Sequence, residues 1–194
     1  MKTKTRDMMW VAMFAALTAI GAFMRIETPL VPITLQFAFC AFSGVLLGAK
    51  KGALSQTVYV TIGLMGFPVF TRGGGPYYVL EPTFGYLVGF IACAYLIGKM
   101  TERITGLETR TSLYRLTFAV ISGLGAVYLL GVVHLYLVVN WVSGHALSIP
   151  GALFAGVVPF IAGDVLVGML VVISSRKVIP VLRTFQPSLL VSAE

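Results

Sequence analysis

The chain has 194 residues, of which 58% are hydrophobic and 11% charged, and its formal net charge is +7. A soluble domain typically carries roughly 25% charged residues, so this sequence has too few polar side chains to cover a surface in water. The basic residues lie between apolar runs rather than in one tract, which argues against a nucleic-acid-binding protein. We therefore expect a single domain over residues 1–194, embedded in a lipid bilayer.

Six apolar runs are candidates for membrane-spanning helices. A helix needs ~20 residues to cross the ~30 Å hydrocarbon core at 1.5 Å per residue. The fold class predicted is an all-α integral membrane protein with six transmembrane helices, at about residues 8–24, 30–49, 52–66, 82–98, 114–139 and 159–179.

The basic residues are divided unequally between alternate loops. Twelve of the fourteen Lys and Arg residues precede the first run, lie between runs two and three or four and five, or lie near or after the end of the sixth run, if Arg115 at the start of the fifth run is counted with the preceding loop. The remaining two, Arg25 and Arg72, lie in the other loops. Because cytoplasmic loops carry the excess of Lys and Arg, this pattern predicts that both termini are in the cytoplasm.

The first run carries small residues on one face. Ala12, Ala15, Ala16 and Ala19 recur at i, i+3, i+4 and i+7, a spacing that places them together on a helix. Small residues allow close approach of helices in lipid, so the stripe predicts a tightly docked helix. The residues alone leave open whether its partner belongs to this chain or to another.

Two loops on the predicted outer face contain groups suited to a ligand. Thr34 and Gln36 follow two prolines in the first loop; they could bind a ligand or simply cap the next helix. The second loop joins flexible glycines to aromatic rings and to Arg72, which could meet an anion. An interfacial hairpin with an aromatic belt is the alternative. The residues concerned are Gly73, Gly74, Gly75, Phe67, Phe70, Tyr77 and Tyr78.

Asp164 is the most informative single residue. It lies about one and a half turns inside the sixth run, which begins at Pro159. An ionisable residue in a membrane helix costs roughly 2.5–3.5 kcal/mol at the helix centre and usually faces a cavity or a partner. Asp164 is therefore predicted to bind a ligand, and a structural pair with Arg25 or Arg72 is the alternative.

Sequence motifs for catalysis are missing. The chain contains no G-x-x-x-x-G-K-[ST] phosphate-binding loop, no G-x-S-x-G and no H-E-x-x-H. We therefore predict that the chain is not an enzyme, that it holds no metal or cofactor, and that it does not bind ATP by itself.

A series of motifs resembles the BioY family, the biotin-specific substrate-binding components (S-components) of energy-coupling factor (ECF) transporters. These motifs follow in order along most of the chain: 31–36 (VPITLQ), 63–70 (GLMGFPVF), 73–75 (GGG), 82–90 (PTFGYLVGF) and 159–164 (PFIAGD).

The resemblance implies an S-component-like bundle in a prokaryotic cell membrane, with a biotin site that opens outward beneath the two loops. It implies that small residues of the first helix dock to a transmembrane coupling protein (T component) that carries two ATPase subunits. Asp164 would accept the ureido N–H groups of biotin, and Thr83 and Tyr86 would add polar contacts. Phe70, Tyr77 and Tyr78 would pack on its rings, and the three glycines would form a lid.

The chain departs from the family pattern at three positions. Gly74 or a neighbour stands where some members have asparagine, Glu81 stands where glycine often precedes Pro82, and the third is an expected site residue. The family commonly places a lysine three residues after the aspartate, and this chain has Val167 there. Arg72 is the substitute candidate for the ligand carboxylate. The alternatives are an S-component for another small vitamin, a stand-alone secondary transporter driven by Asp164 protonation and, third, an intramembrane enzyme.

Overall fold

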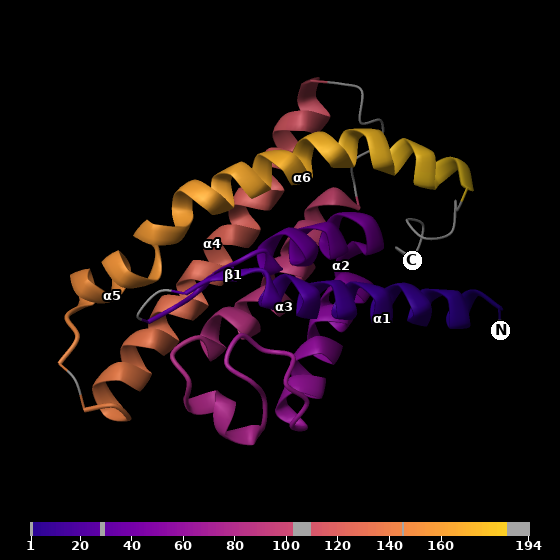
Figure 1. Ribbon diagram of the computed structural model, residues 1–194. Helices are drawn as coiled ribbons and strands as arrows, with labels where there is room; N and C mark the ends of the chain where they lie inside the picture. The colour runs from indigo at the N-terminus through magenta and orange to yellow at the C-terminus, as the bar shows by residue number, and fades with distance from the viewer. Residues whose placement is uncertain (1, 28–29, 103–109, 145, 186–194) are drawn as a thin grey trace.

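The computed structural model describes residues 2–27, 30–102, 110–144 and 146–185, and these residues form a helical bundle (Figure 1). Its helices are α1 (Lys2–Phe23), α2 (Gln36–Leu64), α3 (Phe84–Thr101), α4 (Arg110–Trp141), α5 (Ile149–Gly156) and α6 (Val158–Phe185). The loop after α1 contains a two-stranded antiparallel ladder, β1 (Arg25–Ile26) with β2 (Ile33–Thr34). The loop between α2 and α3 contains one 3₁₀ helix, η1 (Pro76–Leu80).

α2 reverses direction at Gly48. This residue has φ 79° and ψ −179°, which is a conformation essentially restricted to glycine. Gln36 Nε2 donates a hydrogen bond to Tyr59 Oη at 2.8 Å, although 23 residues of continuous helix would separate them by about 35 Å. Residues 36–47 and 49–64 are therefore two antiparallel arms.

Polar contacts show which helix ends lie together. Lys51 Nζ lies 2.9 Å from Asp7 Oδ2, and Glu102 accepts a hydrogen bond from the Ala49 amide. The start of α1 and the end of α3 therefore meet beside Gly48, and we call this side of the bundle the Gly48 end. At the opposite side, the loop end, Arg25 donates to the carbonyl oxygen of Thr71.

The later helices alternate between the same two ends. Gly85, near the start of α3, packs on His134 of α4, whereas Gly123 packs on Ile97 near the end of α3. α4 thus begins at the Gly48 end and finishes at the loop end. α6 lies across the bundle, and its last residues lie at the same end as the start of α1 (Figure 1).

The helices are long and apolar enough for an integral membrane protein. Within the described chain, five helical stretches meet the length and composition needed to cross a bilayer: 5–23, 36–64, 84–101, 113–141 and 149–177. The helical class of the prediction is confirmed. The second and third predicted spans fall together in α2 and correspond to its two arms.

Several predicted boundaries differ from the structure. The helix predicted from residue 30 begins at Gln36, because the preceding residues form β2 and a turn. Lys50 and Lys51, expected in a loop, lie in the first turn of the second arm, because the reversal needs only Gly48. α5 was not predicted; its N-cap, Ser148, accepts a hydrogen bond from the Gly151 amide.

The alanine stripe of α1 is divided between two surroundings. Ala15 is 5% exposed in the core and Ala19 packs against it, whereas Ala12 and Ala16 are exposed. The Ala15 and Ala19 part of the stripe therefore packs against helices of this same chain. Ala12 and Ala16 are the stripe residues left free to meet another chain.

Candidate ligand-binding site

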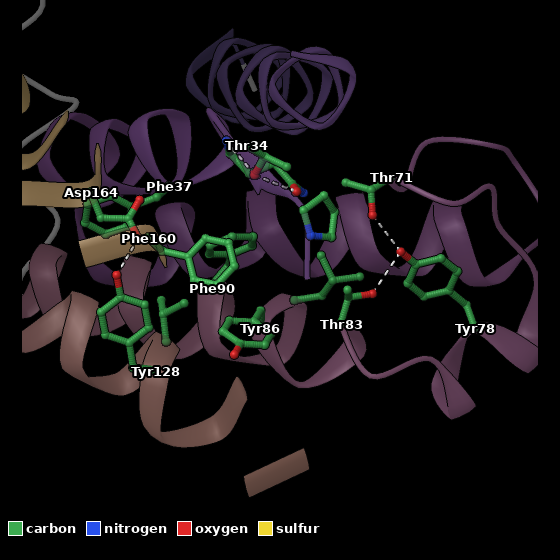
Figure 2. Close-up of a pocket in the computed structure, with 14 residues that line it drawn as sticks. Thr34, Phe37, Thr71, Tyr78, Thr83, Tyr86, Phe90, Tyr128, Phe160 and Asp164 are labelled. Atoms are coloured by element: carbon green, nitrogen blue, oxygen red, sulfur yellow. Dashed lines mark hydrogen bonds between the residues drawn. The ribbon is translucent and has the colours of Figure 1, made fainter. Parts of the chain in front are cut away.

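A cavity of about 60 Å³ lies among the helices near the loop end (Figure 2). Its wall joins residues from β2, both loops, α2, α3, α4 and α6. One part is apolar and aromatic, made by Pro32, Phe37, Leu87, Phe90, Val127 and Phe160. The other part is polar and carries hydroxyl, amide and carboxylate groups, from Thr34, Gln36, Thr71, Tyr78, Thr83, Tyr86, Tyr128 and Asp164.

Asp164 is the carboxylate of this wall, and Tyr128 is its partner. Tyr128 donates its hydroxyl to Asp164 Oδ2 at 2.6 Å, a distance typical of a charge-assisted bond. Arg25 pairs with Glu27, and Arg72 pairs with Glu81. Asp164 thus lines the cavity and has Tyr128 as its hydrogen-bond partner among the described residues. It does not form the alternative structural pair with Arg25 or Arg72.

Tyr86 presents its ring, rather than its hydroxyl, to the cavity. The hydroxyl donates to the carbonyl oxygen of Gly156 at 2.8 Å and so joins α3 to the end of α5. Gly131 and Gly156 lie so close to this side chain that a Cβ on either would be within 2.6 Å of it. The predicted site residue therefore lines the cavity, held by packing on two sides.

Two hydrogen-bonded chains carry the remaining predicted polar residues. Thr83 donates to Tyr78 Oη at 3.1 Å, and Tyr78 Oη lies 3.0 Å from Thr71 Oγ1 (Figure 2). In the second chain, Thr34 donates to Gln36 Oε1 at 3.1 Å. The Gln36 amide in turn bonds Tyr59, which is not itself in the wall.

Six predicted contacts lie outside the cavity wall. Phe70 is 1% exposed, and its ring packs between Tyr59 and Tyr78, at centroid distances of 5.4 and 4.5 Å. Arg72 is part of the surface ion pair with Glu81, at 3.3 Å. The other four are Tyr77, which is 84% exposed, and Gly73, Gly74 and Gly75. Their direct contact with a ligand stays a prediction.

The glycines shape the loop between α2 and α3. A Cβ on Gly74 would lie 2.1 Å from the carbonyl oxygen of Phe67, and Gly73 and Gly75 have φ 108° and 112°. The Gly75 amide donates to the carbonyl oxygen of Gly63 at 2.7 Å, which ties the loop to the end of α2. These residues allow the tight path that brings Thr71 and Tyr78 to the cavity.

Sequence reasoning missed two polar residues of the wall. Tyr128 lies alone among apolar residues of α4, without a recognisable motif. Thr71 was not predicted, although it lies next to Arg72, which was. The signal available for Tyr128 was a hydroxyl within a membrane helix, because such a group needs a partner. The apolar wall residues carried no signal that distinguishes them from core.

A groove lies between α4 and α6 on the far side of Asp164. It encloses about 330 Å³ and is apolar except for Asp164 and Thr117. Ile121, Met169 and Ile173 in its wall are each more than half exposed. Asp164 therefore borders both the partly polar cavity and an apolar, outward-facing groove.

Comparisons with known proteins show which sequences and structures this chain is similar to. The sequence model of the BioY family matches residues 1–184. A probable biotin transporter BioY of Lysinibacillus sphaericus is 49% identical over 140 residues, which cover 72% of this chain and 69% of that protein. The biotin transporter BioY of Thermotoga maritima is 36% identical over 162 residues, covering 83% of this chain and 88% of that protein.

A solved structure has the same fold. The crystal structure of the S-component for biotin from an ECF-type ABC transporter superposes with a TM-score of 0.78 at 25% sequence identity. The superposition covers 91% of this chain and 92% of the other.

Proposed function

Because the chain belongs to the BioY family, we propose that it binds biotin in the cavity beside Asp164 and serves as the S-component for biotin uptake by an ECF transporter. The observation that carries this proposal is a carboxylate in the wall of a partly aromatic cavity, within a helical membrane bundle.

The chemistry of biotin fits the two parts of the wall. Its ureido ring offers N–H donors, which Asp164 accepts, and a hydrogen bond to a charged group contributes roughly 1.5–3 kcal/mol. Its apolar ring carbons and sulfur pack on the aromatic part, where Phe37, Phe90 and Phe160 lie. Thr34, Gln36 and the Thr71–Tyr78–Thr83 chain provide the remaining polar contacts.

Biotin enters when the loop between α2 and α3 moves outward. Ligand sites typically enclose about 300–1,000 Å³, whereas this cavity encloses about 60 Å³. Thr71 and Tyr78 of the wall belong to this loop, and Gly73 and Gly75 there have positive φ. The loop is therefore the lid, and Arg72 on it meets the carboxylate of biotin once the lid has closed over the bound ligand.

In this proposal the cavity opens to the outside of a prokaryotic cell membrane. The two arms of α2 together with α1, α3, α4 and α6 make six crossings, with both termini in the cytoplasm. Lys50, Lys51 and Lys99 lie at the Gly48 end, whereas Arg25 and Arg72 lie at the loop end. The excess of basic residues supports a cytoplasmic Gly48 end.

Energy for uptake comes from partner proteins. The sequence contains no phosphate-binding loop for ATP, so a T component and two ATPase subunits supply it. The exposed Ala12 and Ala16 of α1 give the T component a surface on which helices approach closely. The chain itself contributes one membrane domain, residues 1–194, and a transport role rather than catalysis.

Isothermal titration of the purified protein with biotin tests this proposal. Asp164→Asn removes the charge of the acceptor and is expected to weaken binding by about tenfold or more, given the strength of charged hydrogen bonds. Asp7→Asn is the matched control, because Asp7 lies at the Gly48 end beside Lys51. Wild-type affinity in Asp164→Asn would remove Asp164 from the biotin site.

A further inference from the structure

Asp164 borders two neighbouring spaces. It lines the cavity, and it also lines the apolar groove between α4 and α6. A carboxylate turned toward the groove would face hydrocarbon in a membrane, which is unfavourable, and would present nothing to a ligand in the cavity. A second residue must therefore hold it on the cavity side.

Tyr128 occupies the position from which this can be done. Its hydroxyl makes the one hydrogen bond to the Asp164 carboxylate that the described residues provide, to Oδ2 at 2.6 Å. Its ring lines the cavity and packs against the hydrophobic core. A tyrosine side chain has only two rotatable angles, so core packing fixes where the hydroxyl lies.

The bond also distinguishes the two carboxylate oxygens. Oδ2 is engaged by Tyr128, while Oδ1 has no hydrogen-bond partner among the described residues. An ionised carboxylate accepts at both oxygens, so Oδ1 keeps its full capacity for a donor from the ligand. The hydroxyl thus assigns one oxygen to the protein and leaves the other to the ligand.

We propose that Tyr128 is a positioning residue, which holds the Asp164 carboxylate toward the cavity through Oδ2 and leaves Oδ1 to accept the ureido N–H of biotin. This inference rests on the proposed biotin site. Tyr128 acts through Asp164, so removing its hydroxyl changes the carboxylate first and biotin affinity as a consequence.

The environment of the Asp164 carboxylate can be measured directly by carbon-13 NMR. Asp7 and Asp164 are the chain's only aspartates, so labelling with aspartate that carries carbon-13 at the side-chain carboxyl carbon, Cγ, gives two carboxyl NMR signals. Asp7→Asn assigns them, and the Asp7 signal then serves as the internal reference. Tyr128→Phe removes one hydroxyl and keeps the ring, and Tyr136→Phe makes the same change two turns along α4, away from the cavity wall.

Tyr128→Phe is expected to shift the Asp164 signal in the absence of biotin, to leave the Asp7 signal in place, and to weaken biotin binding by about tenfold. Tyr136→Phe is expected to change neither signal nor affinity. Equal thermal midpoints for the two variants would show that the difference does not come from loss of fold.

The contrary results separate this inference from the proposed function. An unmoved Asp164 signal in Tyr128→Phe, with or without weaker binding, overturns the positioning role, as does a shifted signal with wild-type affinity. If biotin fails to bind the wild-type protein, or binds without shifting the Asp164 signal, the proposed site itself is wrong and the positioning role falls with it.

Discussion

Glu102 Oε1 accepts a hydrogen bond from the Ala49 amide at 2.8 Å, which joins the residue after α3 to the first residue after the Gly48 reversal. The first amides of a helix lack intrahelical partners and favour a negative charge beside them. The Glu102 carboxylate meets both needs for the second arm of α2. The reversal can therefore occur at a single residue, and the two arms bring Gln36 and Tyr59 together at the loop end.

Gly48→Ala should destabilise the protein by about 1–3 kcal/mol. The backbone at Gly48 is in a region essentially closed to other residues, and the added Cβ would lie 2.8 Å from Glu102 Oε1. Thermal unfolding in detergent measures the change. Gly125→Ala is the control, because Gly125 lies within α4 with open space around it, where alanine favours the helix. Equal midpoints for the two variants would contradict the strain argument.

The reversal shows what the sequence could predict and what it could not. Apolar runs separated by Lys50 and Lys51 correctly predict two helical segments, because hydropathy follows composition. The position of the break was wrong, since Gly48 and Gly52 flank the same lysines and only the folded backbone distinguishes a positive-φ residue from a packing glycine. Gly52 lies against Ser43 and Gly44 within the hairpin.

The site was predictable where a residue is chemically unusual for a membrane helix. Asp164 stood out as a charge among apolar residues, and the cavity wall includes it. Tyr128 was not identified as a site residue, and Phe70 was predicted to contact the ligand. An aromatic residue in an apolar run has the same sequence pattern whether it faces a cavity, the core or lipid. The distinction depends on helix packing, which puts Phe70 beneath Tyr78 and Tyr128 beside Asp164.

Gly131→Ala should weaken biotin binding while the fold is kept. The new methyl group would lie 2.4 Å from two ring carbons of Tyr86, so the ring must move, and it forms part of the cavity wall. Overpacking of this kind typically costs about 1–3 kcal/mol. We expect a loss of at least severalfold in affinity by isothermal titration, whereas Gly125→Ala on the same helix should bind as the wild type does. Unchanged affinity in Gly131→Ala would show that the Tyr86 ring does not contact biotin.

Ala16→Trp and Ala15→Trp should have different effects. Ala16 is exposed on α1, so a large side chain there should prevent copurification with the T component and leave biotin binding intact. Ala15 is 5% exposed, so the same change should destabilise the protein itself, by about 1–3 kcal/mol or more. Copurification and thermal unfolding separate the two outcomes. Assembly of Ala16→Trp with the T component would exclude this face of α1 as the docking surface.

Arg72 and Glu81 provide paired tests of how the carboxylate of biotin is recognised. Val167 stands where a family lysine is expected, and the described cavity wall contains no basic side chain. Arg72 Nη1 lies 3.3 Å from Glu81 Oε2, so Glu81 competes with an incoming anion for Arg72. Arg72→Gln should weaken biotin binding about threefold to tenfold, and Glu81→Gln should strengthen it slightly, since exposed ion pairs contribute about 0–1 kcal/mol.

Biotin amide, which lacks the negative charge, makes the test specific. Titrations with this compound should give nearly the same affinity for the wild type, Arg72→Gln and Glu81→Gln. Arg25→Gln is the matched control at the loop end, because Arg25 is held by Glu27 and by the Thr71 carbonyl. If Arg25→Gln lowers affinity for biotin but not for its amide, and Arg72→Gln does not, then Arg25 is the residue that meets the carboxylate, and the proposed role of Arg72 is wrong.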